Sequence, residues 1–309
     1  MRTVVLANSE GGVGMPAAVE ALVTKRSALD AVEAGIRVVE FDPTVRSVGF
    51  GGVPNLLGEV ECDASIMCGS SLRSGAVGAL KDYLHPISVA RQVMERTPHV
   101  MLVGEGAALF AAEIGEQKGN LLSEEAKIEY EGWLKDRLPA DVLAKWPEVP
   151  LIPIVSGPED LHTAHGTTVF LVRTDDGHIA GGDSTSGWPY KYPGRLGDSP
   201  IIGAGLYVDN RYGGVACTHT GEMTIRAGTA RAVISYMKKG AAMQEACYEG
   251  LNDLKALRGG YLGPVVVHAI DAVGNPFVLA VGFEKSVSYW FWTDEMAEIE
   301  CRNAVVEQI

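Results

Sequence analysis

The run His165-Gly166-Thr167-Thr168 lies halfway along the chain, just before the strand-like run Val169-Phe170-Leu171-Val172. If the bond between Gly166 and Thr167 were cleaved, Thr167 would begin the strand with a hydroxyl nucleophile and a free α-amine on one residue. Such a cut constrains the fold, because both halves would have to belong to one folded unit. A lone Gly-Thr pair is more often a turn that leads into an ordinary strand, since Thr favours strands and Gly favours turns.

Three polar clusters that follow this run favour the functional interpretation. Each contains glycine and lies between apolar runs. The clusters are Asp183-Ser184-Thr185-Ser186-Gly187, Gly194-Arg195-Leu196-Gly197-Asp198-Ser199-Pro200 and Cys217-Thr218-His219-Thr220-Gly221-Glu222.

The composition is that of a globular protein with a substantial core. The chain has 309 residues, of which 47% are hydrophobic, so length allows one large domain or two small ones. The 26 Lys and Arg residues are outnumbered by 39 Asp and Glu residues, and no basic run appears. A nucleic-acid partner is therefore not expected, because a phosphate backbone would be repelled.

Neither a membrane partner nor a bound cofactor is indicated. Residues 1–14 hold only a short apolar run, and no stretch approaches the length of a membrane span, so we expect a cytoplasmic protein. The five cysteines show no CxxC or His-rich spacing, which argues against a disulfide framework and a zinc site. The glycine-rich segment 47–55 fits neither the dinucleotide nor the P-loop fingerprint, and we expect no metal and no cofactor.

Apolar spacing predicts alternating strands and helices in the first half. Ser27 can cap a helix, with Asp30 in the capping-box position. The predicted elements are a strand at 4–7, helices at 16–25 and from 28, a strand, glycine loop and hairpin partner over 47–67, and helices at 87–96 and 106–114.

From Glu116 to Ala164 the charge rises and prolines recur, which predicts a connecting, partly mobile region. This region suits one fold that is cut after Gly166, because the new chain end needs room to move away. An ordinary linker between separable domains is the alternative. Strands are predicted at 169–173, 178–181, 264–270, 276–281 and 287–291, with a helix at 225–239. Strands from both halves, with helices between them, predict layered sheets flanked by helices.

The chain resembles the glycosylasparaginase and plant-type asparaginase family of N-terminal nucleophile hydrolases over nearly its whole length. The resemblance in the first half is carried by segments 27–33, 47–55, 63–67 and 103–106. In the second half it is carried by Gly166-Thr167, by segment 194–200, and by Thr218 with Gly221-Glu222. It implies an α/β fold, a four-layer αββα sandwich of two mainly antiparallel sheets, in one domain over 1–309. It also implies autocleavage into chains 1–166 and 167–309.

The resemblance assigns Thr167 as the nucleophile that attacks the side-chain amide of an asparagine-derived substrate, with its α-amine as the base. An unperturbed α-amine with a pKa of about 7.7 to 8.0 is substantially neutral near physiological pH. Thr185 would orient or tune the nucleophile. Thr218 would donate to the oxyanion together with the N–H of residue 219. A strand-end Thr that bonds only the backbone is the plain alternative for Thr185 and Thr218.

Arg195 resembles the guanidinium that clamps the substrate's α-carboxylate, and Asp198 would receive its α-ammonium. In isolation, Arg-Leu-Gly-Asp is more often a surface turn with an ion pair. His219 departs from the glycosylasparaginase branch, which usually has Gly there, so it would narrow the pocket or pack beside it.

The junction and the upstream half point to different branches of the family. Gly-Thr is typical of the asparaginase and isoaspartyl peptidase branch, so the leaving group could be ammonia, a glycosylamine or an amino acid. We expect glycosylasparaginase first and isoaspartyl peptidase or asparaginase second, in a homo-oligomer built as a dimer of cleaved units. An uncleaved scaffold or small-molecule binder on the same fold is a third hypothesis.

Overall fold

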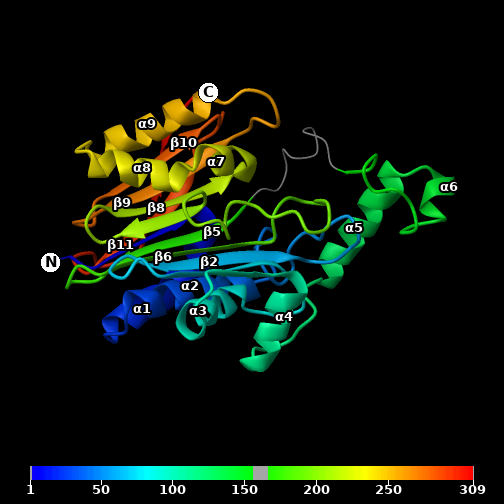
Figure 1. Ribbon diagram of the computed structural model, residues 1–309, viewed down its shortest axis with the longest axis horizontal. Coiled ribbons are helices and arrows are strands. Elements are labelled where there is room, and N and C mark those ends of the chain that lie inside the picture. Colours follow the sequence, from blue (N-terminus) through cyan, green and yellow to red (C-terminus); the bar gives the residue numbers. More distant parts are fainter. Residues whose placement is uncertain (1, 156–165, 309) are drawn as a thin grey trace.

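The computed structural model describes residues 2–155 and 166–308. The larger of its two sheets joins strands from both halves of the chain (Figure 1). Its strands are β1 (Val4–Asn8), β2 (Cys62–Cys68), β3 (Ser74–Leu80), β4 (Met101–Val103), β5 (Thr168–Arg173), β6 (Ile179–Thr185), β11 (Ser288–Thr293) and β12 (Glu300–Asn303). They lie in the order β12-β11-β1-β5-β6-β2-β3-β4, and only the β3–β4 pair is parallel. Strand β1 therefore lies between two strands that follow Thr167 in the sequence.

The smaller sheet comes entirely from residues after Thr167. Its strands are β7 (Leu206–Asp209), β8 (Gly213–His219), β9 (Val265–Asp271), β10 (Pro276–Val281) and β13 (Val305–Glu307). The order is β13-β10-β9-β8-β7, with only the β10–β13 pair parallel.

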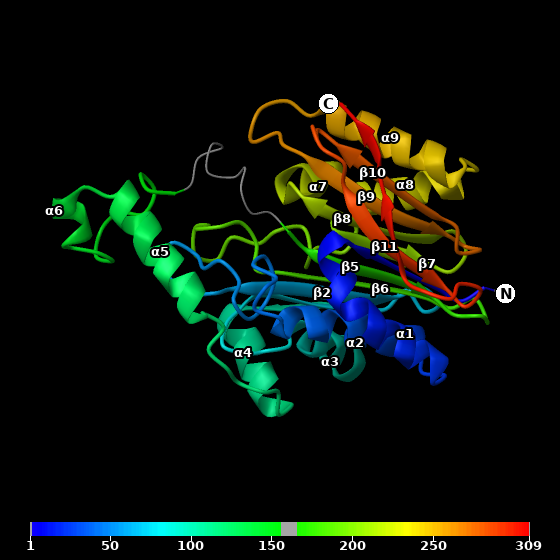
Figure 2. The same ribbon diagram turned by 180° about the vertical axis from the view of Figure 1, so that it is seen from behind.

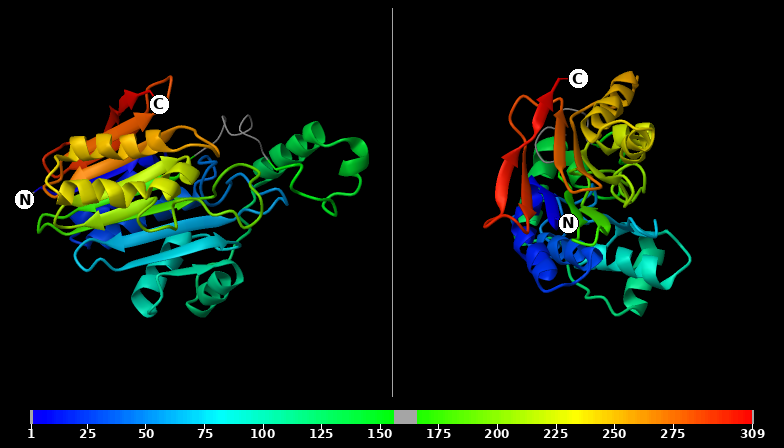
Figure 3. Two further views of the ribbon diagram at one scale, coloured as in Figure 1. Left: turned by 45° about the horizontal axis from the view of Figure 1, so that its top comes forward. Right: turned by 90° about the vertical axis from the view of Figure 1, so that its left-hand side faces the viewer.

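Helices cover the outer face of each sheet. Figure 3 shows α8 (Thr229–Lys238) and α9 (Met243–Ala256) over the smaller sheet and the early helices below the larger one. The other helices are η1 (Ser9–Gly14), α1 (Met15–Val23), α2 (Ala28–Phe41), α3 (Pro86–Arg96), α4 (Gly104–Glu113), α5 (Glu124–Arg137), α6 (Ala140–Leu143) and α7 (Gly221–Ala227). The predicted four-layer αββα sandwich is confirmed.

The apolar run at the start of β1 explains how the layers join. Val5 and Ala7 belong to the core under α1 and α2, whereas Val4 and Leu6 belong to the core between the sheets. Successive strand residues point to opposite faces, so a strand buried on both faces must be apolar at every position. A third core lies between the smaller sheet and α8 and α9.

Several local predictions are confirmed. The Ser27 hydroxyl accepts from the N–H of Asp30 at 3.2 Å, and the Asp30 carboxylate accepts from the N–H of Ser27 at 3.0 Å, which closes the predicted capping box. The predicted hairpin joins β5 to β6, where Gly177 N–H donates to the carbonyl of Thr174 at 2.9 Å.

The strand predicted within 47–55 is wrong. This segment forms turns, and the next strand begins only at Cys62. Gly49 and Gly51 have φ angles of 61° and 82°, in the left-handed region, and two such residues cannot continue an extended strand. Gly49 also passes close to the Glu40 backbone, where a Cβ would clash.

The connecting region predicted from Glu116 to Ala164 has helical structure of its own. The connecting region contains α5 and α6, which extend away from the sheets in both opposite views (Figure 2). Ser123 caps α5, with Glu124 and Glu125 in its first turn, so local end signals support a helix that lacks a clear apolar stripe. The part of this region at 156–164 lies outside the described residues.

The single helix predicted at 225–239 is in fact two helices, because Gly228 takes a left-handed φ of 61° between α7 and α8.

No helix within residues 2–155 and 166–308 has both the length and the apolar character needed to cross a membrane.

Candidate active site

Adjacent strands of the larger sheet and one strand of the smaller sheet bring the predicted site residues together. Thr167 immediately precedes β5, Thr185 ends β6, and Thr218 lies near the end of β8. A small cavity is lined by Gly166, Thr167, Thr185, Gly187, Trp188, Arg195, Gly197, Asp198 and His219. Among the predicted residues that the structure describes, Thr218 alone is not in this lining, and its hydroxyl lies 3.0 Å from Nδ1 of His219.

Asn8 fixes the main chain around Thr167. Its Nδ2 donates to the carbonyl of Thr167 at 2.5 Å, and its Oδ1 accepts from the N–H of Val169 at 3.0 Å. Asn8 is buried at the end of β1, directly beside β5 in the sheet. No sequence motif predicts a role for Asn8, although a polar residue that ends a fully buried apolar strand is a usable signal.

The neighbouring Thr168 does not line the cavity. It is fully buried in β5, and its hydroxyl has no hydrogen-bond partner within the described part of the chain. The geometry therefore favours Thr167 over Thr168 as the residue that can reach a substrate.

Thr185 contacts the peptide bond that is predicted to be cleaved. Its hydroxyl donates to the carbonyl of Gly166 at 2.8 Å and accepts from the N–H of Gly187 at 2.9 Å. A hydroxyl in this place polarises the Gly166 carbonyl and can stabilise negative charge that develops on its oxygen.

Arg195 is held in place on two sides. Its Nε and Nη2 donate to Oε1 of Glu222 at 3.0 and 2.9 Å, and its guanidinium carbon lies 4.5 Å from the Trp188 ring centroid. Glu222 does not engage Nη1. A Cβ on Gly187 or Gly197 would lie 3.2 or 3.1 Å from Nη1, which places this nitrogen beside two glycines of the cavity wall.

Asp198 lies in the same wall. Its Oδ2 accepts from the Thr224 hydroxyl at 2.6 Å. Burial raises the pKa of the Asp198 carboxyl to about 6, while Thr224 and the positive charge of Arg195 act in the opposite direction. The group is therefore mostly ionised at neutral pH, as a partner for an ammonium group must be.

His219 has an unusual backbone for a residue with a side chain. Its φ is 83°, and such a conformation costs a non-glycine residue on the order of 1 kcal/mol. The ring lines the cavity and meets Phe283 edge to face, with centroids 4.9 Å apart. The ring therefore packs against Phe283 and also forms part of the cavity wall.

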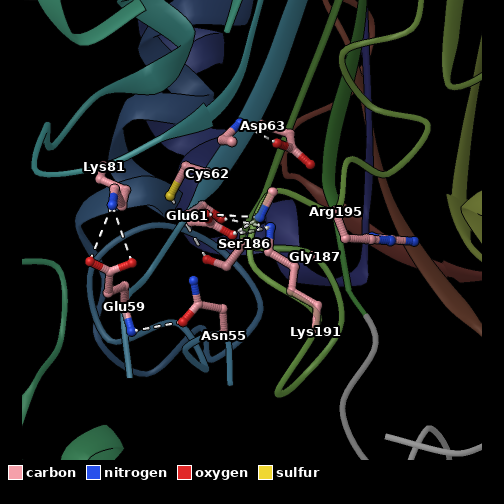
Figure 4. Close-up of polar contacts among 12 residues, drawn as sticks. Asn55, Glu59, Glu61, Cys62, Asp63, Lys81, Ser186, Gly187, Lys191 and Arg195 are labelled. Atoms are coloured by element: carbon pink, nitrogen blue, oxygen red, sulfur yellow. Dashed lines mark hydrogen bonds and ion pairs between the residues drawn. The ribbon is translucent and has the colours of Figure 1, made fainter. Parts of the chain in front are cut away.

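Buried charges anchor the loop that carries Arg195 and Asp198 (Figure 4). Nζ of Lys191 donates to the carbonyl of Glu61 at 3.1 Å, and the Glu61 carboxylate accepts from the N–H of Gly194 at 3.1 Å. Nζ of Lys191 also lies 3.9 Å from Oε2 of Glu61, and Figure 4 shows the Arg195 side chain pointing away from this ion pair. The Asp63 carboxylate accepts from the N–H of Gly197 at 3.1 Å, so strand β2 sets the position of the loop.

The cavity has a volume of about 10 Å³, which is room for roughly one water molecule. A larger cleft of about 790 Å³ lies beside α2 and α3, and none of the predicted site residues lines it. Its Arg91 is already paired with Asp30 and Glu33, each at 2.7 Å. Within residues 2–155 and 166–308, no group of three His, Cys, Asp or Glu side chains could hold a metal ion.

Two stacked, mainly antiparallel sheets between helical layers form the sandwich of the N-terminal nucleophile hydrolases. The sequence model of the asparaginase family matches residues 14–301, so the chain belongs to this family. The predicted resemblance is thereby confirmed, as is an amidohydrolase of the asparaginase type.

Relatives carry names from both branches. The chain is 44% identical to an N(4)-(beta-N-acetylglucosaminyl)-L-asparaginase of Elizabethkingia miricola, over 72% of this chain and 61% of that protein, which is less than two thirds of its length. It is 40% identical to a plant-type L-asparaginase of Pyrococcus horikoshii, over 89% of this chain and 87% of that protein. A probable isoaspartyl peptidase/L-asparaginase of Drosophila melanogaster is 37% identical, over 81% of this chain and 76% of that protein.

Proposed function

We propose that the chain is an N-terminal threonine amidohydrolase that cleaves itself between Gly166 and Thr167 and then hydrolyses the side-chain amide of an asparagine derivative. The observation that carries the proposal is that Thr167, Arg195 and Asp198 line one cavity. A nucleophile, a carboxylate clamp and an ammonium acceptor are the three groups that an aspartyl unit requires.

In the proposed reaction, the hydroxyl of Thr167 attacks the substrate's side-chain carbonyl carbon, and the α-amine of Thr167 takes the hydroxyl proton. The Thr218 hydroxyl and the N–H of residue 219 stabilise the oxyanion. The protonated α-amine then donates this proton to the leaving nitrogen as the amide carbon–nitrogen bond breaks. An aspartyl ester remains on Thr167. Water then hydrolyses the ester, which releases aspartate and restores the hydroxyl.

Arg195 and Asp198 hold the substrate so that its carbonyl reaches Thr167. Glu222 and Trp188 keep the guanidinium in one orientation, which leaves less conformational freedom to be lost when the substrate binds. Binding energy is thereby converted into positioning of the reacting atoms.

We propose glycosylasparaginase as the physiological activity, in line with the Elizabethkingia relative. The second candidate is an isoaspartyl peptidase with asparaginase activity. It is favoured by the Gly166-Thr167 junction and by the larger shared length with the plant-type relatives. A cytoplasmic location and a dimer of cleaved units remain predictions.

A denaturing gel and a product analysis test this proposal. The purified protein should give two fragments, 1–166 and 167–309, and the second should have Thr as its N-terminal residue. Release of aspartate should then be compared for glycosylasparagine, asparagine and a β-aspartyl dipeptide. One intact band with no turnover of any of the three would instead support the scaffold or binder.

A further inference from the structure

The carboxyl group of Glu10 lies against the residue that carries the predicted scissile carbonyl. Glu10 belongs to η1, directly after β1. A Cβ built on Gly166 would overlap Oε1 and Cδ of Glu10 and the hydroxyl of Ser47, so the carboxyl is in contact with the Cα of Gly166. Only glycine fits at position 166 with Glu10 in this place.

Beside this contact, two polar atoms have no hydrogen-bond partner among the described residues. Oε2 of Glu10 and Oγ of Ser47 are both buried, and neither makes a hydrogen bond within the part of the chain that the structure describes. A buried carboxylate oxygen that has no partner among the described residues destabilises the fold, which points to a functional reason for keeping it.

Burial raises the pKa of the Glu10 carboxyl to about 7, and the nearby Ser47 hydroxyl and Asn8 amide lower it by less. Neither of these neighbours titrates in this range. A carboxyl with such a pKa exists in both protonation states near neutral pH, as a group that both accepts and donates a proton should.

Self-cleavage needs a base that the mature mechanism cannot supply. In the uncut chain the nitrogen of Thr167 is part of the peptide bond, where resonance delocalises its lone pair into the Gly166 carbonyl, so it is not a base for the hydroxyl proton. Thr185 is a donor to the Gly166 carbonyl and so serves the oxygen instead. Two other carboxylates are less suited as the base. The Asp198 carboxylate accepts from the Thr224 hydroxyl, and the Asp183 carboxylate accepts from the Ser65 hydroxyl at 2.7 Å and does not line the cavity.

We propose that Glu10 is the general base and then the general acid of cleavage at Gly166-Thr167, an inference that rests on the proposed function. The Glu10 carboxylate takes the proton of the Thr167 hydroxyl while the hydroxyl oxygen of Thr167 bonds to the Gly166 carbonyl carbon. The same proton then passes to the Thr167 nitrogen as the carbon–nitrogen bond breaks, which leaves an ester and a free amine. Water hydrolyses the ester to the Gly166 carboxylic acid and the Thr167 hydroxyl.

The test is the rate of self-cleavage of freshly synthesised full-length chain, followed by gel after pulse labelling in cell-free translation at pH values from 5.5 to 8.5. The variants are Glu10→Gln, Glu10→Asp and, as a matched control, Glu20→Gln, whose exposed carboxyl lies on α1. Thr167→Ala marks the uncut chain.

In the wild type and in Glu20→Gln, the rate should rise through about pH 7, because the base must be ionised. Glu10→Gln should slow cleavage by on the order of 10²-fold or more and abolish this rise. Glu10→Asp retains a carboxylate and should retain a rise with pH. Circular dichroism reports whether each variant folds, and if Glu10→Gln does not fold, the pH profile of Glu10→Asp decides.

The role of Glu10 is overturned if the Glu10→Gln chain cleaves itself at a rate within threefold of the wild type. It is also overturned if the cleavage rate of Glu10→Asp does not rise with pH. Either result leaves the proposed function standing. If the wild type and Glu20→Gln both remain intact at every pH, the proposed self-cleavage is wrong, and the role of Glu10 falls with it.

Discussion

Replacement of Arg195 by Lys tests the substrate clamp while it keeps the charge. Arg195 uses Nε and Nη2 to bind Glu222, and Nη1 lies beside the cavity. A lysine has one nitrogen, which cannot bind Glu222 as a fork and at the same time reach a substrate carboxylate with the same geometry. A hydrogen bond to a charged group contributes about 1.5 to 3 kcal/mol, so kcat/KM should fall by roughly 10- to 150-fold.

Self-cleavage should proceed nearly as in the wild type, because no free α-carboxylate takes part in it. The assay is steady-state hydrolysis of glycosylasparagine, asparagine and a β-aspartyl dipeptide, beside a gel that reports cleavage. Arg211→Lys is the matched control, because Arg211 is largely exposed and pairs with Asp209 away from the cavity. Unchanged kcat/KM of Arg195→Lys for all three substrates would refute the clamp, and the pocket would have to be assigned elsewhere.

Three further variants probe the other site residues. Thr167→Ala should abolish both self-cleavage and hydrolysis, whereas Thr167→Ser should keep some of each. Gels report the cleavage and turnover assays report the hydrolysis, and an active Thr167→Ala protein would contradict the mechanism. Because burial raises the pKa of Asp198 to about 6, kcat/KM should fall as the pH falls through that value, and Asp198→Asn should be weak at every pH without this limb. His219→Gly should open the cavity wall and raise kcat/KM for glycosylasparagine relative to asparagine, and an unchanged ratio would show that the ring does not restrict the leaving group.

Much of the fold could be predicted because its signals are local. The run Val4–Ala7 is apolar at every position, as a strand buried on both faces requires, and Ser27 with Asp30 closes a capping box within a few residues. The same reliance on local signals explains the errors. The glycines of 47–55 looked like a hairpin loop, but close passage beside Glu40 decides the conformation of Gly49.

The site was predicted less completely because its supporting contacts connect distant parts of the chain. Asn8 and Thr167 are 159 residues apart in the sequence, and Asp63 and Gly197 are 134 residues apart. Sequence motifs predicted which residues would carry chemistry, such as Arg195. They did not show that Glu222 orients its guanidinium or that Asn8 holds the main chain at Thr167.

The geometry links the proposed cleavage to access as well as to chemistry. In the uncut chain, Gly166 forms part of the cavity wall and its carbonyl accepts a hydrogen bond from the Thr185 hydroxyl, so only about 10 Å³ remains between the site residues. That space cannot hold an aspartyl unit. Departure of Gly166 would enlarge the cavity, release the Thr185 hydroxyl to act beside Thr167, and create the α-amine that the mature reaction needs as its base. Hydrolysis of added substrate should therefore begin only as the 167–309 fragment accumulates.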